Sequence, residues 1–222
     1  MNNRNLSREC VAEFIGTFAL IFVGVGTIYH NPGLLSVALA HGVTIAVMAS
    51  ALGAISGGQF NPAVTFGLLV GGKISFQKSI AYVAAQLAGA TAAGFLCVAL
   101  LNGTTAVANG TPDIGMINGA PVTFAQAVIV EAVLTFFLVL VVYGTAVDGR
   151  APKIGGLAIG MTVTLDILFG GPFTGAAMNP ARTFGPALAS GHWNNHAVYW
   201  IGPLLGALAA GLVYGKFLIR EK

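Results

Sequence analysis

Two asparagines, each followed by proline and alanine, are the polar residues whose spacing most clearly suggests chemistry. The triplets are Asn61-Pro62-Ala63 and Asn179-Pro180-Ala181, which lie 118 positions apart. Asparagine is a preferred N-cap and proline suits the first helical position, so each triplet predicts the start of a helix. A capping asparagine accepts a backbone N–H with its oxygen, which fixes its amide as an oriented donor. One Asn-Pro pair is most simply a turn signal, whereas two copies in register favour a functional site.

Ionisable residues inside apolar stretches are the other candidates, and they are Glu13, His41, Glu131, Asp166 and Arg182. Arg182 follows Asn179 by three residues, which places it on the same helix face and about 4.5 Å further along. A guanidinium at that place would repel cations and donate hydrogen bonds. No nucleophile–base pair, metal-ligand cluster or phosphate-binding loop accompanies these residues. The sequence therefore predicts neither an enzyme nor a cofactor or metal site.

The elements that position these residues follow from the composition. Of 222 residues, 56% are hydrophobic and 8% are charged, whereas a soluble domain carries about 25% charged residues. A soluble fold is excluded, and the absence of a basic stripe argues against nucleic-acid binding. We expect an all-α membrane protein that forms one channel domain over residues 1–222.

Six apolar segments are long enough to cross a bilayer. They are Cys10–Tyr29, Leu34–Leu52, Ser75–Leu101, Phe124–Val147, Lys153–Phe169 and His196–Phe217. Two further stretches, Ser56–Gly72 and Gly170–Ala189, are apolar but too short to cross. Each of these short stretches contains one Asn-Pro-Ala triplet.

The distribution of Lys and Arg predicts the orientation. Nine of the ten fall in the termini and in the second and fourth loops, which six spans place on one side: Arg4, Arg8, Lys73, Lys78, Arg150, Lys153, Lys216, Arg220 and Lys222. The positive-inside rule then makes both termini cytoplasmic. Arg182 is the exception, and topology does not explain it.

An internal repeat relates the two halves at the same offset of 118. Glu13 aligns with Glu131, Gly42 with Gly160, and the two triplets with each other. The repeats cover about residues 9–101 and 124–217, and each contains three spans. An odd number of spans makes the repeats inverted, so the two short stretches enter the membrane from opposite faces.

Each short stretch is expected to descend without helix and to return as a half-helix. The glycines of Ser56-Gly57-Gly58 and Gly170-Gly171 would give the backbone freedom to descend, and half-helices Ala63–Leu69 and Ala181–Leu188 would run back out. The two helix N-termini would meet near the midplane, each with about half a positive charge. Such a centre repels cations. A water that accepts from both asparagines cannot continue a proton-conducting chain.

These residues resemble the aquaporin family, also called major intrinsic proteins. The similarity extends over nearly the whole chain and is carried by Ala12-Glu13-Phe14, by residues 56–65, and by Asn179-Pro180-Ala181-Arg182 with the four residues after it. It implies six membrane helices, two re-entrant half-helices and a homotetramer in the lipid bilayer with one pore in each subunit. It also implies passive flow of water or small neutral solutes.

The family's selectivity filter would fall on His41, Ile167, Ala176 and Arg182. Water-selective members typically have Phe and His at the first two places, so this set implies a wider constriction. It resembles the set of plant tonoplast members, which as a group are associated with water plus ammonia or urea; hydrogen peroxide is a further candidate. Glycerol facilitators typically carry Asp where this chain has Thr183.

The resemblance also implies that Glu13 and Glu131 accept hydrogen bonds from the re-entrant loops. Asp166 would orient groups behind the constriction or lie at a subunit contact, and the sequence does not choose between these roles. A glycerol facilitator and a secondary transporter with inverted repeats are the alternative functions. The compact termini favour a bacterial inner membrane.

Overall fold

The computed structural model describes residues 3–152 and 154–219, with side chains from Asn5 onward. Six of its helices are long and apolar enough to cross a membrane. They are α1 (Asn3–Tyr29), α2 (Leu34–Ser56), α4 (Phe76–Leu100), α6 (Phe124–Val142) with the π-helical extension η1 (Tyr143–Val147), α7 (Gly155–Thr174), and α9 (Val198–Leu212) with the extension η2 (Val213–Leu218). These helices confirm the six expected spans.

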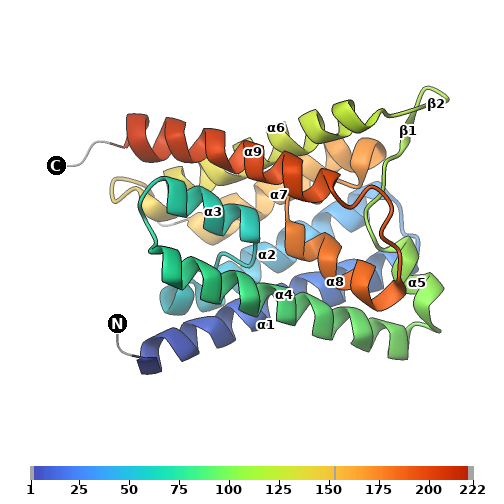
Figure 1. Ribbon diagram of the computed structural model, residues 1–222, viewed down its shortest axis with the longest axis horizontal. Helices are drawn as coiled ribbons and strands as arrows, with labels where there is room; N and C mark the ends of the chain where they lie inside the picture. The colour runs from blue at the N-terminus through green and yellow to red at the C-terminus, as the bar shows by residue number, and fades with distance from the viewer. Residues whose placement is uncertain (1–2, 153, 220–222) are drawn as a thin grey trace.

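Five shorter elements complete the fold. They are α3 (Pro62–Val70), α5 (Thr104–Asn109), β1 (Met116–Ile117), β2 (Ala120–Pro121) and α8 (Pro180–Ser190). The two strands pair as a small antiparallel hairpin. The long helices run along the longest axis of the molecule, while α3 and α8 extend inward from opposite ends (Figure 1). The expected pair of half-helices is therefore present.

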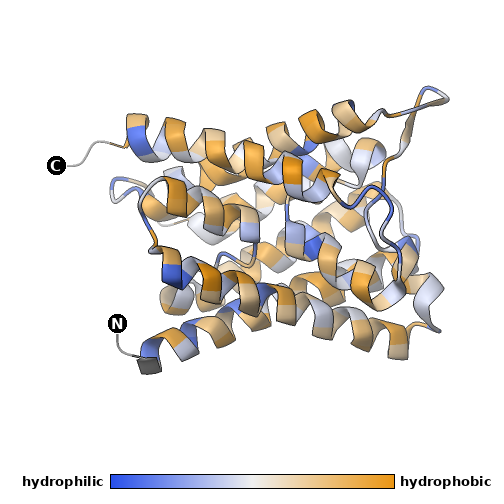
Figure 2. Ribbon diagram, in the orientation of Figure 1, coloured by the Kyte–Doolittle hydropathy of each residue, from blue (hydrophilic) through white to orange (hydrophobic). Residues whose placement is uncertain are grey.

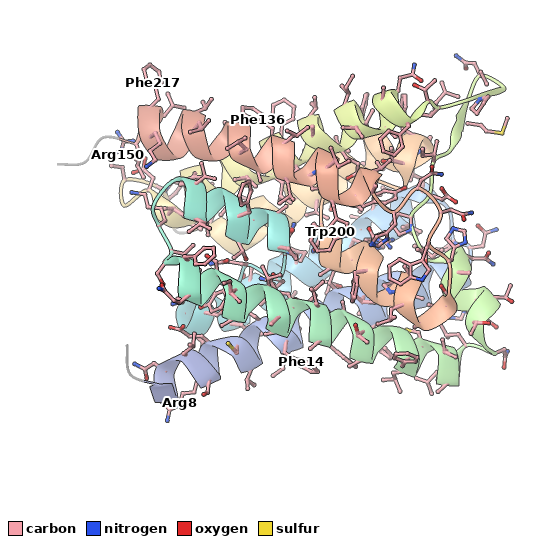
Figure 3. The ribbon with its side chains drawn as sticks, viewed as in Figure 1. Arg8, Phe14, Phe136, Arg150, Trp200 and Phe217 are labelled. Carbon is pink, nitrogen blue, oxygen red and sulfur yellow. The ribbon has the colours of Figure 1, made fainter. Side chains whose placement is uncertain are left out.

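The beginning of α1 and the end of η2 lie at one end of the molecule, together with the α3–α4 and α6–α7 connections (Figure 1). Arg8 and Arg150 lie at this end (Figure 3). Hydrophobic residues predominate along the helices, and hydrophilic residues gather at the connections (Figure 2). Of the nine cations expected here, Lys153, Arg220 and Lys222 lie outside the described residues, as does the side chain of Arg4.

The expected descent at Gly170-Gly171 is wrong. Both glycines are helical residues of α7, which continues past Phe169 to Thr174 and contains Pro172. A Cβ at Gly170 would overlap Leu134, so this glycine serves close helix packing instead of a turn. The chain reverses at Gly175, whose φ of 76° is in the left-handed region that glycine favours. In the first repeat the reversal follows Ser56 at Gly57, as expected.

Glycines also bring the two repeats into contact. A Cβ added at Gly42 on α2 would overlap the carbonyl oxygen of Gly160 on α7, and a Cβ at Gly160 would overlap that of Gly42. The two glycines are equivalent in the repeat, so a residue of each repeat touches its own counterpart. That reciprocal contact is what a two-fold relation between the halves requires.

Each half-helix packs against the third span of the other repeat, and these two contacts are also equivalent in the repeat. A Cβ at Gly94 on α4 would lie 2.7 Å from the oxygen of Gly185 on α8, and one at Gly211 on α9 would lie 2.6 Å from the oxygen of Gly67 on α3. Gly94 and Gly211 lie 117 positions apart, one fewer than the offset of 118 that relates the first two spans of the two repeats. Small residues thus seat both half-helices against the bundle.

Candidate functional site

The two half-helices begin with the expected caps. The Asn61 side chain accepts from the N–H of Ala63 at 2.8 Å. The Asn179 side chain accepts from Ala181 at 3.0 Å and from Arg182 at 3.3 Å. Both asparagines have extended backbones, and proline occupies the first turn of each helix. The side-chain oxygens of Asn61 and Asn179 therefore cap the two half-helices.

The amide nitrogens cross between the repeats. Asn61 Nδ2 donates to the carbonyl of Met178 at 2.8 Å, and Asn179 Nδ2 donates to the carbonyl of Phe60 at 2.9 Å. Phe60 and Met178 have positive φ angles of 49° and 52°, which turn these carbonyls inward. The two amides are oriented donors, but they do not offer both of their N–H groups to the cavity. Instead, one N–H of each amide holds the opposite loop, and only the second N–H remains for a permeant.

Glu13 and Glu131 hold the two loops by equivalent hydrogen bonds. Glu13 accepts from Ser56 Oγ at 2.6 Å and from the N–H groups of Gln59 and Phe60 at 3.0 and 2.7 Å. Glu131 accepts from Thr174 Oγ1 at 2.7 Å and from Ala177 and Met178 at 2.9 and 2.7 Å. Every partner differs from its counterpart by 118 positions. Both carboxylates are fully buried, and they satisfy backbone groups that no helix or strand can pair.

Two buried tyrosines support the same loops from the third spans. Tyr82 on α4 donates to the carbonyl of Ser56, and Tyr199 on α9 donates to the carbonyl of Thr174, both at 2.8 Å. Gln86 adds a bond to Glu13 at 2.8 Å that has no counterpart in the second repeat. Sequence reasoning missed these three residues, because a lone Tyr or Gln in an apolar helix carries no signature of its partner.

The four expected filter residues line one internal cavity together with both asparagines: His41, Ile167, Ala176 and Arg182, with Asn61 and Asn179. The remaining wall is mostly apolar and includes Leu20, Ile45, Val64, Leu138, Ile159 and Val163. A path with a few fixed polar groups between apolar walls suits a small neutral permeant.

Arg182 is fixed on two sides although its side chain faces the cavity. Nη1 donates to the carbonyl of Gly110 at 2.8 Å, and Nη2 lies 3.3 Å from His41 Nε2. His41 Nδ1 lies 2.8 Å from the carbonyl of Val37. A guanidinium has no acceptor and a carbonyl has no donor, so His41 carries its proton on Nδ1 and accepts at Nε2. The imidazole is therefore neutral in this arrangement.

The side chains of His41 and Arg182 contact each other directly, so they form one polar group in the lining of the cavity. Arg182 is only 5% exposed and His41 only 3%. The contact draws the guanidinium toward α2. Ile167 and Ala176 also line this cavity and add no polar side chain to it.

Gly110 is a site residue that sequence reasoning missed, since it contributes only a main-chain carbonyl. It follows α5 in the third loop, and nearby contacts fix that loop. Asp113 accepts from Asn195 Nδ2 at 2.8 Å and lies 3.1 Å from His192 Nε2. Burial raises the pKa of Asp113, but hydrogen bonds from Asn195, the Ile114 backbone and His192 outweigh it, so this pKa lies below its usual value. The charged carboxylate ties the loop to the α8–α9 connection.

Asp166 precedes Ile167 but does not line the cavity. It is 6% exposed within the single chain, which argues against a subunit contact. Its Oδ2 has no hydrogen-bond partner among the described residues, so it orients neither a loop nor a histidine through that atom. The described contacts give the Asp166 carboxylate no other role. Within the described residues there is also no group of three or more His, Cys, Asp and Glu residues that could hold a metal.

Comparison with known proteins agrees with this geometry. The family model described as Major intrinsic protein matches residues 1–214. Aquaporin TIP4-4 of Zea mays is 46% identical and the match covers 96% of this chain and 88% of the relative, while Aquaporin TIP2-1 of Arabidopsis thaliana is 45% identical with 94% and 86% covered. These relatives are plant proteins, so the expectation of a bacterial inner membrane has no support.

A solved structure has the same fold. The aquaglyceroporin from Plasmodium falciparum superposes with a TM-score of 0.82 at 25% identity, and the match covers 96% of this chain and 97% of that one. The family match over almost the whole sequence and the paired half-helices lead to one conclusion. The chain belongs to the major intrinsic protein family and is a multi-pass membrane channel of the aquaporin type, not an enzyme.

Proposed function

We propose that the cavity conducts water together with at least one of ammonia, urea and hydrogen peroxide, and that it excludes protons and ions. The observation that carries this proposal is the Arg182–His41 contact at 3.3 Å. It fixes the guanidinium of Arg182 beside His41, while Ile167 and Ala176 add no polar side chain to the lining of the cavity. The filter assignment of these four residues is part of the proposal.

Exclusion of protons would come from the centre of the path. Asn61 and Asn179 each keep one free N–H, and both side chains line the cavity. A water that accepts from both amides turns its hydrogens away, which interrupts a chain of like-oriented waters. The N-termini of α3 and α8 add partial positive charge at the same place. Neutral permeants carry no charge and do not depend on a chain of waters that relays protons, so neither feature blocks them.

Water flux should show the behaviour of a channel and not of a carrier. In proteoliposomes studied by stopped-flow light scattering, we expect a low activation energy, flux proportional to the osmotic gradient, and no dependence on a co-transported ion. The physical reason is that the cavity already exists, so the protein does not have to change conformation to pass each permeant. Saturable uptake coupled to an ion gradient would instead favour the secondary transporter.

The filter proposal predicts a change of solute range. The double variant Ile167→His, His41→Phe should lower the urea-to-water permeability ratio by about tenfold, because phenylalanine is bulkier than the histidine it replaces and histidine adds a polar ring in place of the Ile167 side chain. Wild-type and variant vesicles are compared with water, urea, ammonia, hydrogen peroxide and glycerol. A wild-type protein impermeable to urea, ammonia and peroxide alike would contradict the proposed range. Rapid glycerol flux would favour the glycerol facilitator despite Thr183.

We also propose that the channel is a homotetramer with both termini cytoplasmic. Exposed apolar side chains recur every four residues on α7, at Leu157, Met161, Leu165 and Phe169, and suit lipid or a neighbouring subunit. The described cations at the end where α1 begins and η2 ends support the orientation. Native mass spectrometry of the solubilised protein would count the subunits, and a dimer or monomer would contradict this assembly.

A further inference from the structure

The first helix contributes none of the four filter residues, yet it lies directly behind one of them. A Cβ added at Gly24 on α1 would overlap His41 Nε2 and would lie 2.9 and 3.0 Å from Cε1 and Cδ2 of the same ring. Ordinary Cβ contacts are 3.4–4 Å. The imidazole therefore lies flat against the main chain of α1, in space that only glycine leaves open.

The next residue of α1 supports the second partner of Arg182. Val25 is 1% exposed. A Cβ added at Gly110 would lie 3.0 and 3.2 Å from the two methyl groups of Val25. Because Gly110 provides the carbonyl that accepts from Arg182 at 2.8 Å, consecutive residues of α1 lie behind both groups that hold the guanidinium.

We propose that Gly24 is a positioning residue of the constriction, which sets the width of the path by fixing where the His41 ring lies. This proposal rests on the filter assignment made above. His41 is anchored at Nδ1 by Val37 on its own helix, so a methyl group on Gly24 cannot push the ring along α2. The methyl group must instead tilt the ring away from α1, toward Arg182 and toward the cavity that His41 and Arg182 both line.

The chain provides a matched control two residues away. A Cβ added at Gly26, on the same helix, would meet nothing within 4 Å. Alanine is a better helix former than glycine, so neither Gly24→Ala nor Gly26→Ala should weaken α1 itself. A difference between the two variants reports the contact with His41.

The test compares Gly24→Ala and Gly26→Ala with wild type in proteoliposomes, with water and urea as the probes and flux normalised to the amount of inserted protein. We expect Gly24→Ala to lower the urea-to-water permeability ratio several-fold and Gly26→Ala to leave it unchanged. If Gly24→Ala behaves as Gly26→Ala does, the proposal is overturned.

A double-mutant cycle with His41→Ala separates positioning from a general packing defect. Once the ring is removed, Gly24→Ala should have no further effect on the permeability ratio, and any loss of folded protein caused by Gly24→Ala should be recovered. An effect of Gly24→Ala that persists in full without the ring overturns the proposal. If wild type conducts water but none of urea, ammonia and hydrogen peroxide, the proposed solute range fails, while water permeability across the same cycle still tests Gly24.

Discussion

Replacing Arg182 with valine should preserve the fold and open the channel to protons or other small cations. Valine already occupies the equivalent position of the first repeat, at Val64, where it is buried against the same cavity. The substitution removes the only Lys or Arg among the described residues that line this cavity. A unit charge acts on a cation 4 Å away with about 4 kcal/mol at an effective dielectric constant of about 20. We therefore expect cation entry to rise by roughly a thousandfold.

The measurement is proton influx into vesicles that contain a pH-sensitive dye, driven by a potassium diffusion potential. Wild-type vesicles define the background, and Arg182→Lys keeps a positive charge at this position as the matched control. Water flux in the same preparation shows that the variant is folded and inserted. A valine variant that conducts water without any ionic leak would mean that Arg182 is not the guard, or that the half-helix N-termini are sufficient.

Glu131→Leu should abolish most water flux and destabilise the protein. It removes the acceptor of two buried backbone N–H groups, those of Ala177 and Met178, and of the Thr174 hydroxyl. Each unsatisfied buried donor costs about 1–3 kcal/mol. The loop would relax, and the Met178 carbonyl would no longer hold the amide of Asn61. We expect at least a tenfold loss of water permeability, together with a lower thermal unfolding temperature in detergent.

The control for this variant is Glu9→Gln, which removes a carboxylate at the membrane boundary of α1. Glu9 pairs with Lys78 at 2.9 Å, with 19% and 28% of the two side chains exposed, and glutamine keeps the length and the hydrogen-bonding capacity of the side chain, so the variant loses only the charge of this pair. Its flux and unfolding temperature should stay near wild type. Wild-type behaviour of Glu131→Leu in both assays would show that the loop holds its shape without the carboxylate.

Patterns that depend on residue type alone were sufficient for the spans and the half-helices. Apolar runs of about 20 residues define membrane helices, and Asn-Pro defines a helix start, so α3 and α8 began where expected. The offset of 118 placed Glu13 and Glu131 in equivalent positions before any contact was known. The resemblance to the family assigned His41 and Arg182 to one selectivity filter, and both residues line the same cavity.

What could not be predicted depends on distances between side chains and main chain. Gly170 and Gly57 are the same residue type next to the same kind of loop, but one packs inside a helix and the other reverses the chain. The direct contact of His41 with Arg182 depends on how closely α1 approaches α2, which Gly24 permits. The carbonyl of Gly110 has no signature in sequence, because every residue of the chain has a carbonyl group.

The crossed amide bonds have a consequence for synthesis of the protein on the ribosome. The Asn61 amide nitrogen and the Phe60 carbonyl are hydrogen-bonded to Met178 and Asn179, which are translated about 118 residues later. At about 5–20 residues per second, this interval lasts about 6–24 s. For that time the first half-helix is in the membrane without its counterpart, and the Asn61 amide and the Phe60 carbonyl need water or the insertion machinery as temporary partners. Maturation of the pore is therefore completed late, when the second loop inserts.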